Sequence, residues 1–252
     1  MMIRLHAFAC GWLGADLHLF LTGASGAVRI PVPAYLIEHP RGLVLFDSGL
    51  HTDTRVDPDA RLGFLAKLFK VEFGGGEAVD ERLTARGFDP ARVTHLVTSH
   101  LHFDHVGGHA QIPNARLVVQ RKEWEAGRNP ELMKKNGYDP RDYDLGHPLE
   151  LAYGELDLFG DGRVVCFPTN GHTPGHQSLR VRLDGGESVL TGDACYFRRT
   201  LEEMNLPPIL HDAEQMRESL RRLGKMQAAG AQLFFGHDPE LWATLPEPAV
   251  FA

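Results

Sequence analysis

The chain has 252 residues, of which 43% are hydrophobic and 23% charged, and its formal net charge at pH 7 is −7. These proportions are ordinary for a folded globular protein and exclude collagen-like and disordered chains, while no run of about 18 apolar residues offers a transmembrane helix. Because proteins that bind nucleic acid concentrate Lys and Arg in a patch, the acidic balance argues against a nucleic-acid partner. Cys10, Cys166 and Cys195 are an odd number of cysteines in a chain of this size, which favours free thiols and a cytoplasmic protein.

The first half of the chain is predicted to be rich in strands. Short β-branched and aromatic runs bounded by Gly and Pro predict strands at Ile3–Ala9, Val28–Glu38 and Leu43–Phe46. Apolar residues at three- and four-residue spacing then predict helices over Ala60–Phe69 and Glu77–Arg86. The next predicted strand, Val93–Ser99, leads directly into a cluster of histidines.

The second half alternates strands and helices in the same way. Strands are predicted at Arg116–Val119, Val164–Phe167, Ser178–Leu183, Ser188–Thr191 and Gln232–Phe235. A long helix is predicted over Asp212–Ala229, with shorter helices after Arg121 and after Pro239. Grouped strands with helices between and after them indicate an α/β (α+β) fold of two packed sheets flanked by helices, and the length fits one domain over residues 1–252.

Four residues of types that commonly bind metals lie within six positions after the strand Val93–Ser99. They are His100, His102, Asp104 and His105, in the sequence His-Leu-His-Phe-Asp-His. A lone histidine is usually a core or surface residue satisfied by a backbone carbonyl, but this many polar groups around one turn would be costly to bury without partners. A divalent cation satisfies them together, so the cluster predicts a metal site.

Three further candidate ligands occupy turns that follow later strands, namely His172, Asp193 and His237. Strand ends in an α/β protein converge on one edge of a sheet, so we expect these side chains to meet the histidine cluster. Five histidines and two aspartates are enough for two divalent metal ions if one carboxylate bridges them. Imidazole and carboxylate ligands favour Zn2+, with manganese, iron and cobalt as alternatives.

The segments SHLHFDHVGGH, GHTPGHQS, GDACY and GHDPELW resemble the landmarks of the metallo-β-lactamase superfamily, and they span most of the chain. Within that superfamily the chain is most similar to the N-acyl-homoserine lactonase family. The resemblance implies an αββα sandwich of two mixed β-sheets flanked by helices, with the metals at one sheet edge. It also implies how the ligands divide, which spacing alone leaves open. Asp193 would bridge a first metal, bound by His100, His102 and His172, and a second metal, bound by Asp104, His105 and His237.

The ligand types within this superfamily favour a hydrolase. A glutamate at position 102 would suggest the di-iron redox branch and a cysteine at position 193 a zinc β-lactamase, but the residues are His102 and Asp193. Tyr196 matches a tyrosine that lactonases of the family place beside the substrate carbonyl, although a tyrosine near a strand end often serves only for packing. The resemblance thus implies a quorum-quenching enzyme that opens the ring of N-acyl-homoserine lactones. A bridging hydroxide would attack, Tyr196 would polarise the carbonyl, and Asp104 would pass a proton to the leaving alkoxide.

Other functions are compatible with the same ligands. The nearest is a related lactonase, such as one for pyridoxolactone, and more distant ones are a glyoxalase II-like thioesterase, a phosphotriesterase and a metal-binding protein without turnover. A thioesterase of that kind needs cationic groups to hold the carboxylates of glutathione, and nothing in the sequence locates such a pocket. The predicted partner is a small-molecule lactone, with no nucleic acid or membrane, and the chain is expected to be a monomer or homodimer.

Three expectations concern the surroundings of the metals. Asp47 follows a predicted strand and could either orient a ligand imidazole or cap a turn, whereas we expect His109 to face solvent. An acyl chain needs an apolar wall, and several apolar residues are candidates for it. Core packing or a dimer contact would explain each of these residues equally well. The candidates are Gly63–Phe69, Phe73, Met204, Leu206, Ile209 and Leu210.

Overall fold

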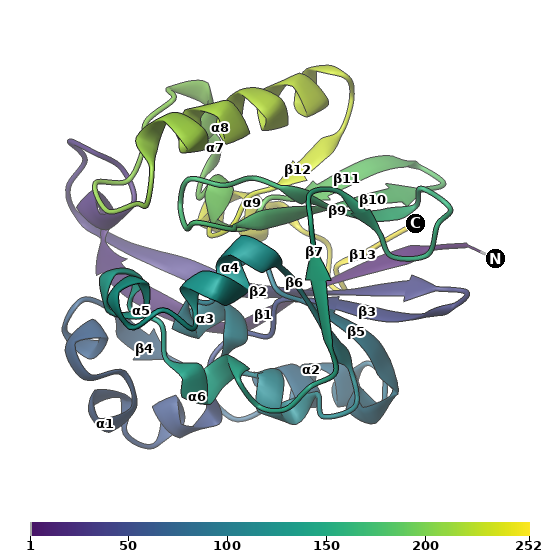
Figure 1. Cartoon of the computed structure of the whole chain (residues 1–252), viewed down its shortest axis with the longest axis horizontal. Coiled ribbons are helices and arrows are strands. Elements are labelled where there is room, and N and C mark those ends of the chain that lie inside the picture. Colours follow the sequence, from purple (N-terminus) through teal and green to yellow (C-terminus); the bar gives the residue numbers. More distant parts are fainter. Residues whose placement is uncertain (1) are drawn as a thin grey trace.

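Two β-sheets lie face to face in the computed structural model, which describes residues 2–252 (Figure 1). The first sheet has eight strands in the order β13-β1-β2-β3-β5-β6-β7, with β4 paired to β1. Its strands are antiparallel from β1 to β3 and parallel from β3 to β7. They are β1 (Arg4–Asp16), β2 (Ala27–His39), β3 (Gly42–Phe46), β4 (Lys70–Glu72), β5 (Val93–Val97), β6 (Arg116–Gln120), β7 (Leu149–Ala152) and β13 (Val250–Phe251).

The second sheet has five strands in the order β12-β11-β10-β9-β8. They are β8 (Leu156–Asp157), β9 (Val164–Pro168), β10 (Gln177–Leu183), β11 (Gly186–Leu190) and β12 (Gln232–Phe234). Neighbouring strands are antiparallel except β11 and β12, which are parallel. Each sheet is therefore mixed.

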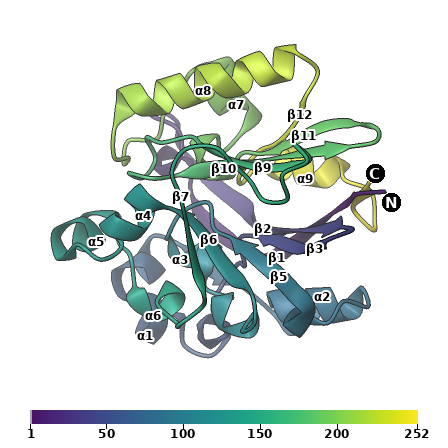
Figure 2. The same cartoon turned by 45° about the vertical axis from the view of Figure 1, so that its right-hand side comes forward.

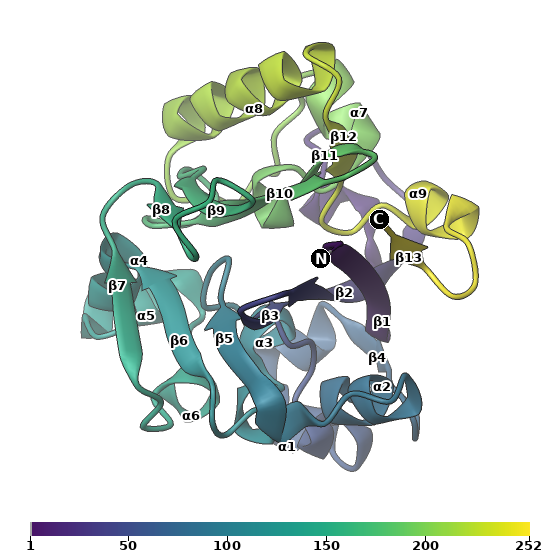
Figure 3. The same ribbon diagram turned by 90° about the vertical axis from the view of Figure 1, so that its right-hand side faces the viewer.

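Helices surround the two sheets. They are α1 (Pro58–Leu62), α2 (Val79–Ala85), α3 (Phe103–Val106), α4 (Arg121–Ala126), α5 (Pro130–Asn136), α6 (Pro140–Tyr143), α7 (Arg198–Glu202), α8 (Ala213–Ala228) and α9 (Pro239–Thr244). Helices α7 and α8 lie over the second sheet, and α1, α2 and α3 lie beneath the first (Figure 3). Helices α4 and α5 lie near the ends of β6 and β7 (Figure 2). The predicted αββα sandwich is confirmed, and no helix within residues 2–252 is long and apolar enough to cross a bilayer.

The alternation of side chains along the strands explains how the layers pack. In β2 the side chains of Tyr35 and Ile37 point between the sheets, where they join Val181 of β10 in one apolar cluster. Leu36 lies between them in the sequence and points to the other face, where it packs in a cluster with Leu83 of α2. Successive residues of a strand face opposite sides, so one strand contributes to both layers of the core.

One predicted helix differs from the structure. Apolar spacing predicts a continuous helix over Ala60–Phe69, but α1 ends at Leu62 and a 3-10 turn follows over Gly63–Lys67. Gly63 has a φ of 57°, a left-handed backbone angle that ends the α-helix. The long helix predicted over Asp212–Ala229 is confirmed as α8. Asp212 caps its first turn by accepting from the N–H groups of Glu214 and Gln215.

Candidate metal centre

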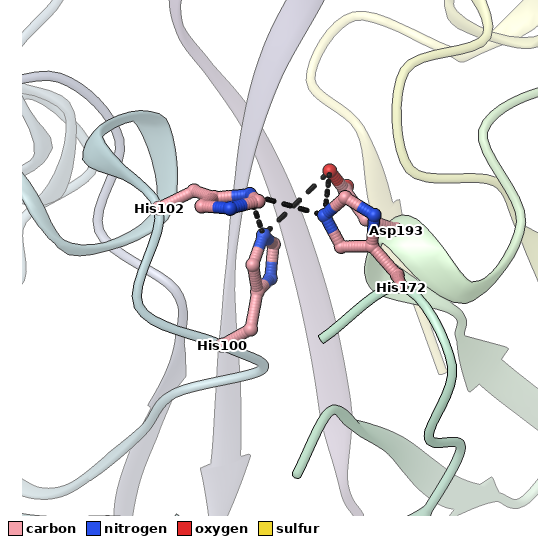
Figure 4. Close-up of side chains that lie close together, drawn as sticks. All are labelled: His100, His102, His172 and Asp193. Atoms are coloured by element: carbon pink, nitrogen blue, oxygen red, sulfur yellow. Dashed lines mark hydrogen bonds and ion pairs between the residues drawn. The ribbon is translucent and has the colours of Figure 1, made fainter. Parts of the chain in front are cut away.

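The first group of predicted ligands meets at the edge where the two sheets come together. His100 and His102 follow β5, His172 follows β9, and Asp193 follows β11 (Figure 4). One ligand atom from each lies within 4.8 Å of the others. Nδ1 of His102 is 2.9 Å from Nε2 of His100 and 3.0 Å from Nε2 of His172. Four potential donors from both sheets therefore point at one small volume.

The second group lies on the other side of Asp193. Asp104 and His105 belong to the short helix α3, His237 follows β12, and one ligand atom from each lies within 4.8 Å of the others. Oδ1 of Asp193 is 3.2 Å from Nε2 of His105 and 3.1 Å from Nε2 of His237. Its other oxygen, Oδ2, is 3.5 Å from Nε2 of His172 in the first group. The structure thus brings all seven predicted ligands together, with Asp193 between the two groups.

The chemistry of this cluster fits divalent metal ions. Nε2 of His105 and Oδ1 of Asp193 are buried and have no hydrogen-bond partner among the described residues. Buried polar atoms without partners cost free energy, and a cation between the nitrogen and oxygen donors would satisfy them. The residues present are therefore suited to two divalent ions that share the Asp193 carboxylate.

Neighbouring groups fix the orientation of two ligand rings. Oδ2 of Asp47 lies 2.8 Å from Nδ1 of His105, and Oδ1 of Asp47 accepts from the backbone N–H of Ser99 at 2.7 Å. Nδ1 of His237 lies 2.7 Å from the carbonyl oxygen of Pro31. Each contact places the ring proton on Nδ1 and leaves Nε2 free to bind a metal. Of the two roles expected for Asp47, the structure shows the contact with an imidazole.

Burial and charge set the protonation of the ligands. Burial lowers the pKa of His100 and His172 well below the ordinary value, so both rings are neutral and can donate a lone pair. Burial would also lower the pKa of His105, but Asp193, Asp104 and Asp47 outweigh it and raise that pKa well above its usual range. Burial alone would raise the pKa of the Asp193 carboxyl, but His105 and the neighbouring histidines outweigh it and hold that pKa well below its usual range. A metal ion would replace the proton of His105.

Tyr196, which is predicted to lie beside the substrate, contacts two of the candidate metal ligands. Its hydroxyl is 3.3 Å from Nδ1 of His172, and its ring stacks on that of His237 with the centroids 5.7 Å apart. Burial, reinforced by the charges of Asp193 and Asp104, raises the Tyr196 pKa well above its usual range. The phenol is therefore neutral and available as a hydrogen-bond donor.

A cavity of about 370 Å3 opens onto this cluster. Of the predicted apolar wall, Phe64, Leu65, Leu68, Phe69 and Ile209 line it. Phe73, Met204, Leu206 and Leu210 do not line it and pack in hydrophobic clusters instead. Sequence reasoning missed Leu19, Phe20 and Phe103, although Phe103 lies inside the histidine motif and that position was a usable signal. Lys134, Lys135 and Asn136 also border the cavity.

Two histidines outside the ligand set are buried near it, His109 against expectation and His176 in line with the prediction that it lies behind the ligands or in the pocket. The prediction that His109 faces solvent is wrong, because the ring is fully buried and its Nε2 lies 3.1 Å from Oγ1 of Thr98. His176 is buried too, and its Nε2 accepts from the backbone N–H of Asp193 at 3.0 Å. His176 thus supports the turn that presents the central carboxylate.

The fold and this site define a class of protein. Residues 27–237 match the family model of the metallo-beta-lactamase superfamily. The chain is 35% identical to the N-acyl homoserine lactonase AttM of Rhizobium johnstonii, over 96% of this chain and 95% of that protein. It is also 30% identical to the N-acyl homoserine lactonase AiiA of Bacillus thuringiensis subsp. kurstaki, over 84% of this chain and 83% of the relative. The chain belongs to the metallo-beta-lactamase superfamily and, within it, to the N-acyl homoserine lactonase family.

A solved structure extends the comparison to three dimensions. An N-acyl homoserine lactone hydrolase, with the product N-hexanoyl-L-homoserine bound at its catalytic metal centre, superposes with a TM-score of 0.85. It is 26% identical in sequence, and the match covers 98% of both chains. Both sheets and the helices around the cavity therefore have counterparts in that hydrolase.

Proposed function

We propose that the chain is a metal-dependent hydrolase of one domain that opens the lactone ring of N-acyl homoserine lactones. The observation that carries the proposal is the convergence of six candidate metal ligands on a seventh, Asp193, at one end of an apolar cavity. The lactonases with which the chain aligns over most of its length support the same substrate class.

The cavity suits a molecule with a polar ring and an apolar tail. His102, Asp104, His172, Asp193, Tyr196 and His237 form the part that would face the ring. The wall that includes Phe20, Phe64, Phe69 and Phe103 would face the acyl chain, and each buried methylene is worth about 0.8 kcal/mol. The volume of about 370 Å3 lies within the usual range of small-molecule sites.

The residues of the chain divide the reaction between them. Two divalent ions, held by the two groups of ligands, would supply Lewis-acid activation of the carbonyl and of water. The Tyr196 hydroxyl would donate a hydrogen bond to the carbonyl oxygen as negative charge develops there. As oxygen from water bonds to the carbonyl carbon and the ring C–O bond breaks, Asp104 would take the proton of the attacking oxygen and pass it to the departing alkoxide, so that the product is the open N-acyl-homoserine.

The metal and the cellular setting belong to the same proposal. Five imidazoles and two carboxylates favour zinc over harder cations. All three cysteines are buried free thiols, which suits the reducing cytoplasm. A small neutral lactone, rather than a nucleic acid or a membrane, fits the cavity, and the chain would act as a monomer or homodimer.

The test is proton release in a weakly buffered solution. The zinc-loaded protein is mixed separately with N-acyl homoserine lactones of several chain lengths and with S-lactoylglutathione, and the pH is followed. We expect acidification with the lactones, because each opened ring yields a carboxylic acid. No acidification with any lactone would overturn the proposal. Acidification with S-lactoylglutathione alone would favour the thioesterase, for which Lys134 and Lys135 at the cavity edge offer the cationic groups.

Metal content tests the dinuclear centre separately. Elemental analysis of the active protein should give about two ions per chain, as a hydrolytic two-metal site requires. Fewer than about 1.5 ions per chain in fully active protein would contradict the two-metal arrangement.

A further inference from the structure

A buried carboxylate lies behind the first group of ligands without belonging to it. Glu123, in the first turn of α4, has no solvent exposure. Glutamate is almost never fully buried unless it is paired, because an unpaired charge in the interior costs several kcal/mol. The contacts of this side chain therefore explain its position.

The two oxygens of Glu123 hold two different loops. Oε1 accepts from the backbone N–H of Leu101, which lies between His100 and His102, at 3.2 Å. Oε2 accepts from the backbone N–H of Gly175, three residues after His172, at 2.8 Å. The first loop follows β5 of one sheet, and the second joins β9 to β10 of the other. One carboxylate thus connects the loops that carry three of the four ligands in the first group.

Two further features show that this connection is tightly built. A Cβ placed on Gly175 would lie 2.2 Å from the backbone nitrogen of Glu123, so the loop packs directly on α4 with no room for a side chain. The hydroxyl of Tyr138 donates to Oε1 of Glu123 at 2.6 Å, and the Tyr138 ring centroid is 5.6 Å from that of His102. The carboxylate therefore has a third donor on the side of His102.

We propose that Glu123 is a positioning residue that sets the separation of His102 and His172, and with it the shape of the first metal site. The proposal rests on the two-metal centre of the proposed function and is independent of the substrate. The ligands of the second group are held by other contacts, since Asp47 orients His105 and the carbonyl of Pro31 orients His237. Loss of the Glu123 contacts should consequently weaken one metal site more than the other.

Glu123→Gln tests this with little change in volume. An amide has one accepting oxygen, so it can satisfy Leu101 or Gly175 but presents N–H to the other, and one loop is released. The probe is Zn2+, titrated into metal-free protein in competition with a chelating dye. We expect one of the two equivalents to bind about 10- to 100-fold more weakly and the other to change less than about twofold, the usual scale for lost outer contacts. If both equivalents stay within about twofold of the wild type, the proposal is overturned.

Two control variants separate positioning from general damage. Glu125→Gln changes an exposed glutamate of the same helix that pairs with Arg121, and it should leave both equivalents unchanged. Tyr138→Phe removes one donor but keeps both loop contacts, so its effect should be smaller than that of Glu123→Gln. Equal weakening in Tyr138→Phe would assign the effect to the hydrogen bond from the Tyr138 hydroxyl and overturn the role of the two loop contacts.

Gly175→Ala provides a second route if Glu123→Gln does not fold, as judged by circular dichroism of the metal-free protein. The added methyl pushes the loop away from α4 while the carboxylate remains. Selective weakening of one equivalent by about tenfold or more supports the proposal, and unchanged binding overturns it. Because the titration contains no lactone, a protein without lactonase activity that still shows selective weakening would contradict the proposed function and leave this inference intact.

Discussion

Oδ2 of Asp47 lies 2.8 Å from Nδ1 of His105, and Nε2 on the other side of that ring is 3.2 Å from Oδ1 of Asp193. The imidazole is thereby held between one carboxylate that orients it and another that would share its metal. Asp47 also accepts from the backbone N–H and the hydroxyl of Ser99, the residue before the histidine cluster. The contact therefore fixes both the ring and the loop from which it projects.

Asp47→Asn should lower the affinity of the second metal site by about 10- to 100-fold. The amide N–H2 would face Nδ1 of His105 and favour the tautomer whose proton lies on Nε2, the nitrogen that must bind the metal. Competition titration with Zn2+ and measurement of kcat at saturating zinc would check this. Recovery of kcat at high zinc is expected, and an affinity equal to that of the wild type would contradict an orienting role for Asp47.

Much of this centre could be predicted from the sequence, for a physical reason. Each ligand follows a strand after a short turn, and chain direction alone brings such strand ends to one edge. Which metal each histidine faces could not be deduced from spacing, because it depends on how β5, β9, β11 and β12 are placed across two sheets. The contact between Glu123 and Gly175 was equally inaccessible, since it joins residues 52 positions apart in the sequence.

Local sequence patterns gave wrong predictions where backbone conformation or tertiary packing determines the structure. Apolar spacing continues through Gly63, but its left-handed backbone ends α1 there and redirects the next turn, so that Phe64 borders the cavity. His109 is polar and was expected outside, yet it is fully buried, with Thr98 as a hydrogen-bond partner. Hydrophobic periodicity predicts neither the end of α1 nor the burial of His109.

Asp104→Asn should reduce kcat by about 100- to 10,000-fold, because a positioned general acid contributes on that scale. Asp104 borders the cavity, and its Oδ2 is 3.6 Å from Nε2 of His237, so it is placed both to bind a metal and to reach the leaving oxygen. The rate must be measured on protein whose metal content has been determined, with Asp184→Asn, on an exposed side chain, as the control. Full turnover with both metals bound would show that another group delivers the proton.

Tyr196→Phe should lower kcat about 2- to 12-fold, since the lost hydrogen bond is worth about 0.5–1.5 kcal/mol. The buried hydroxyl borders the cavity beside His172, and no metal needs it as a ligand, so the metal content should stay the same. Steady-state kinetics with one lactone, together with elemental analysis, would separate the two effects. Tyr153→Phe removes a hydroxyl from a side chain that is 71% exposed and should leave kcat unchanged. An unaltered rate in Tyr196→Phe would show that the hydroxyl has no part in catalysis and that Tyr196 serves only for packing.

Phe64→Ala should impair long-chain lactones more than short-chain ones. Phe64 is 68% exposed and borders the cavity, so its removal takes little from the core but shortens the apolar surface available to an acyl chain. Each methylene that loses this surface gives up at most about 0.8 kcal/mol, which corresponds to a roughly fourfold loss in kcat/KM. The measurement is kcat/KM for a series of acyl lengths, with Val56→Ala, at an 88% exposed position outside the cavity lining, as the control. A uniform loss across all chain lengths would place the acyl chain on another part of the wall, and a loss that grows with length would place it against Phe64.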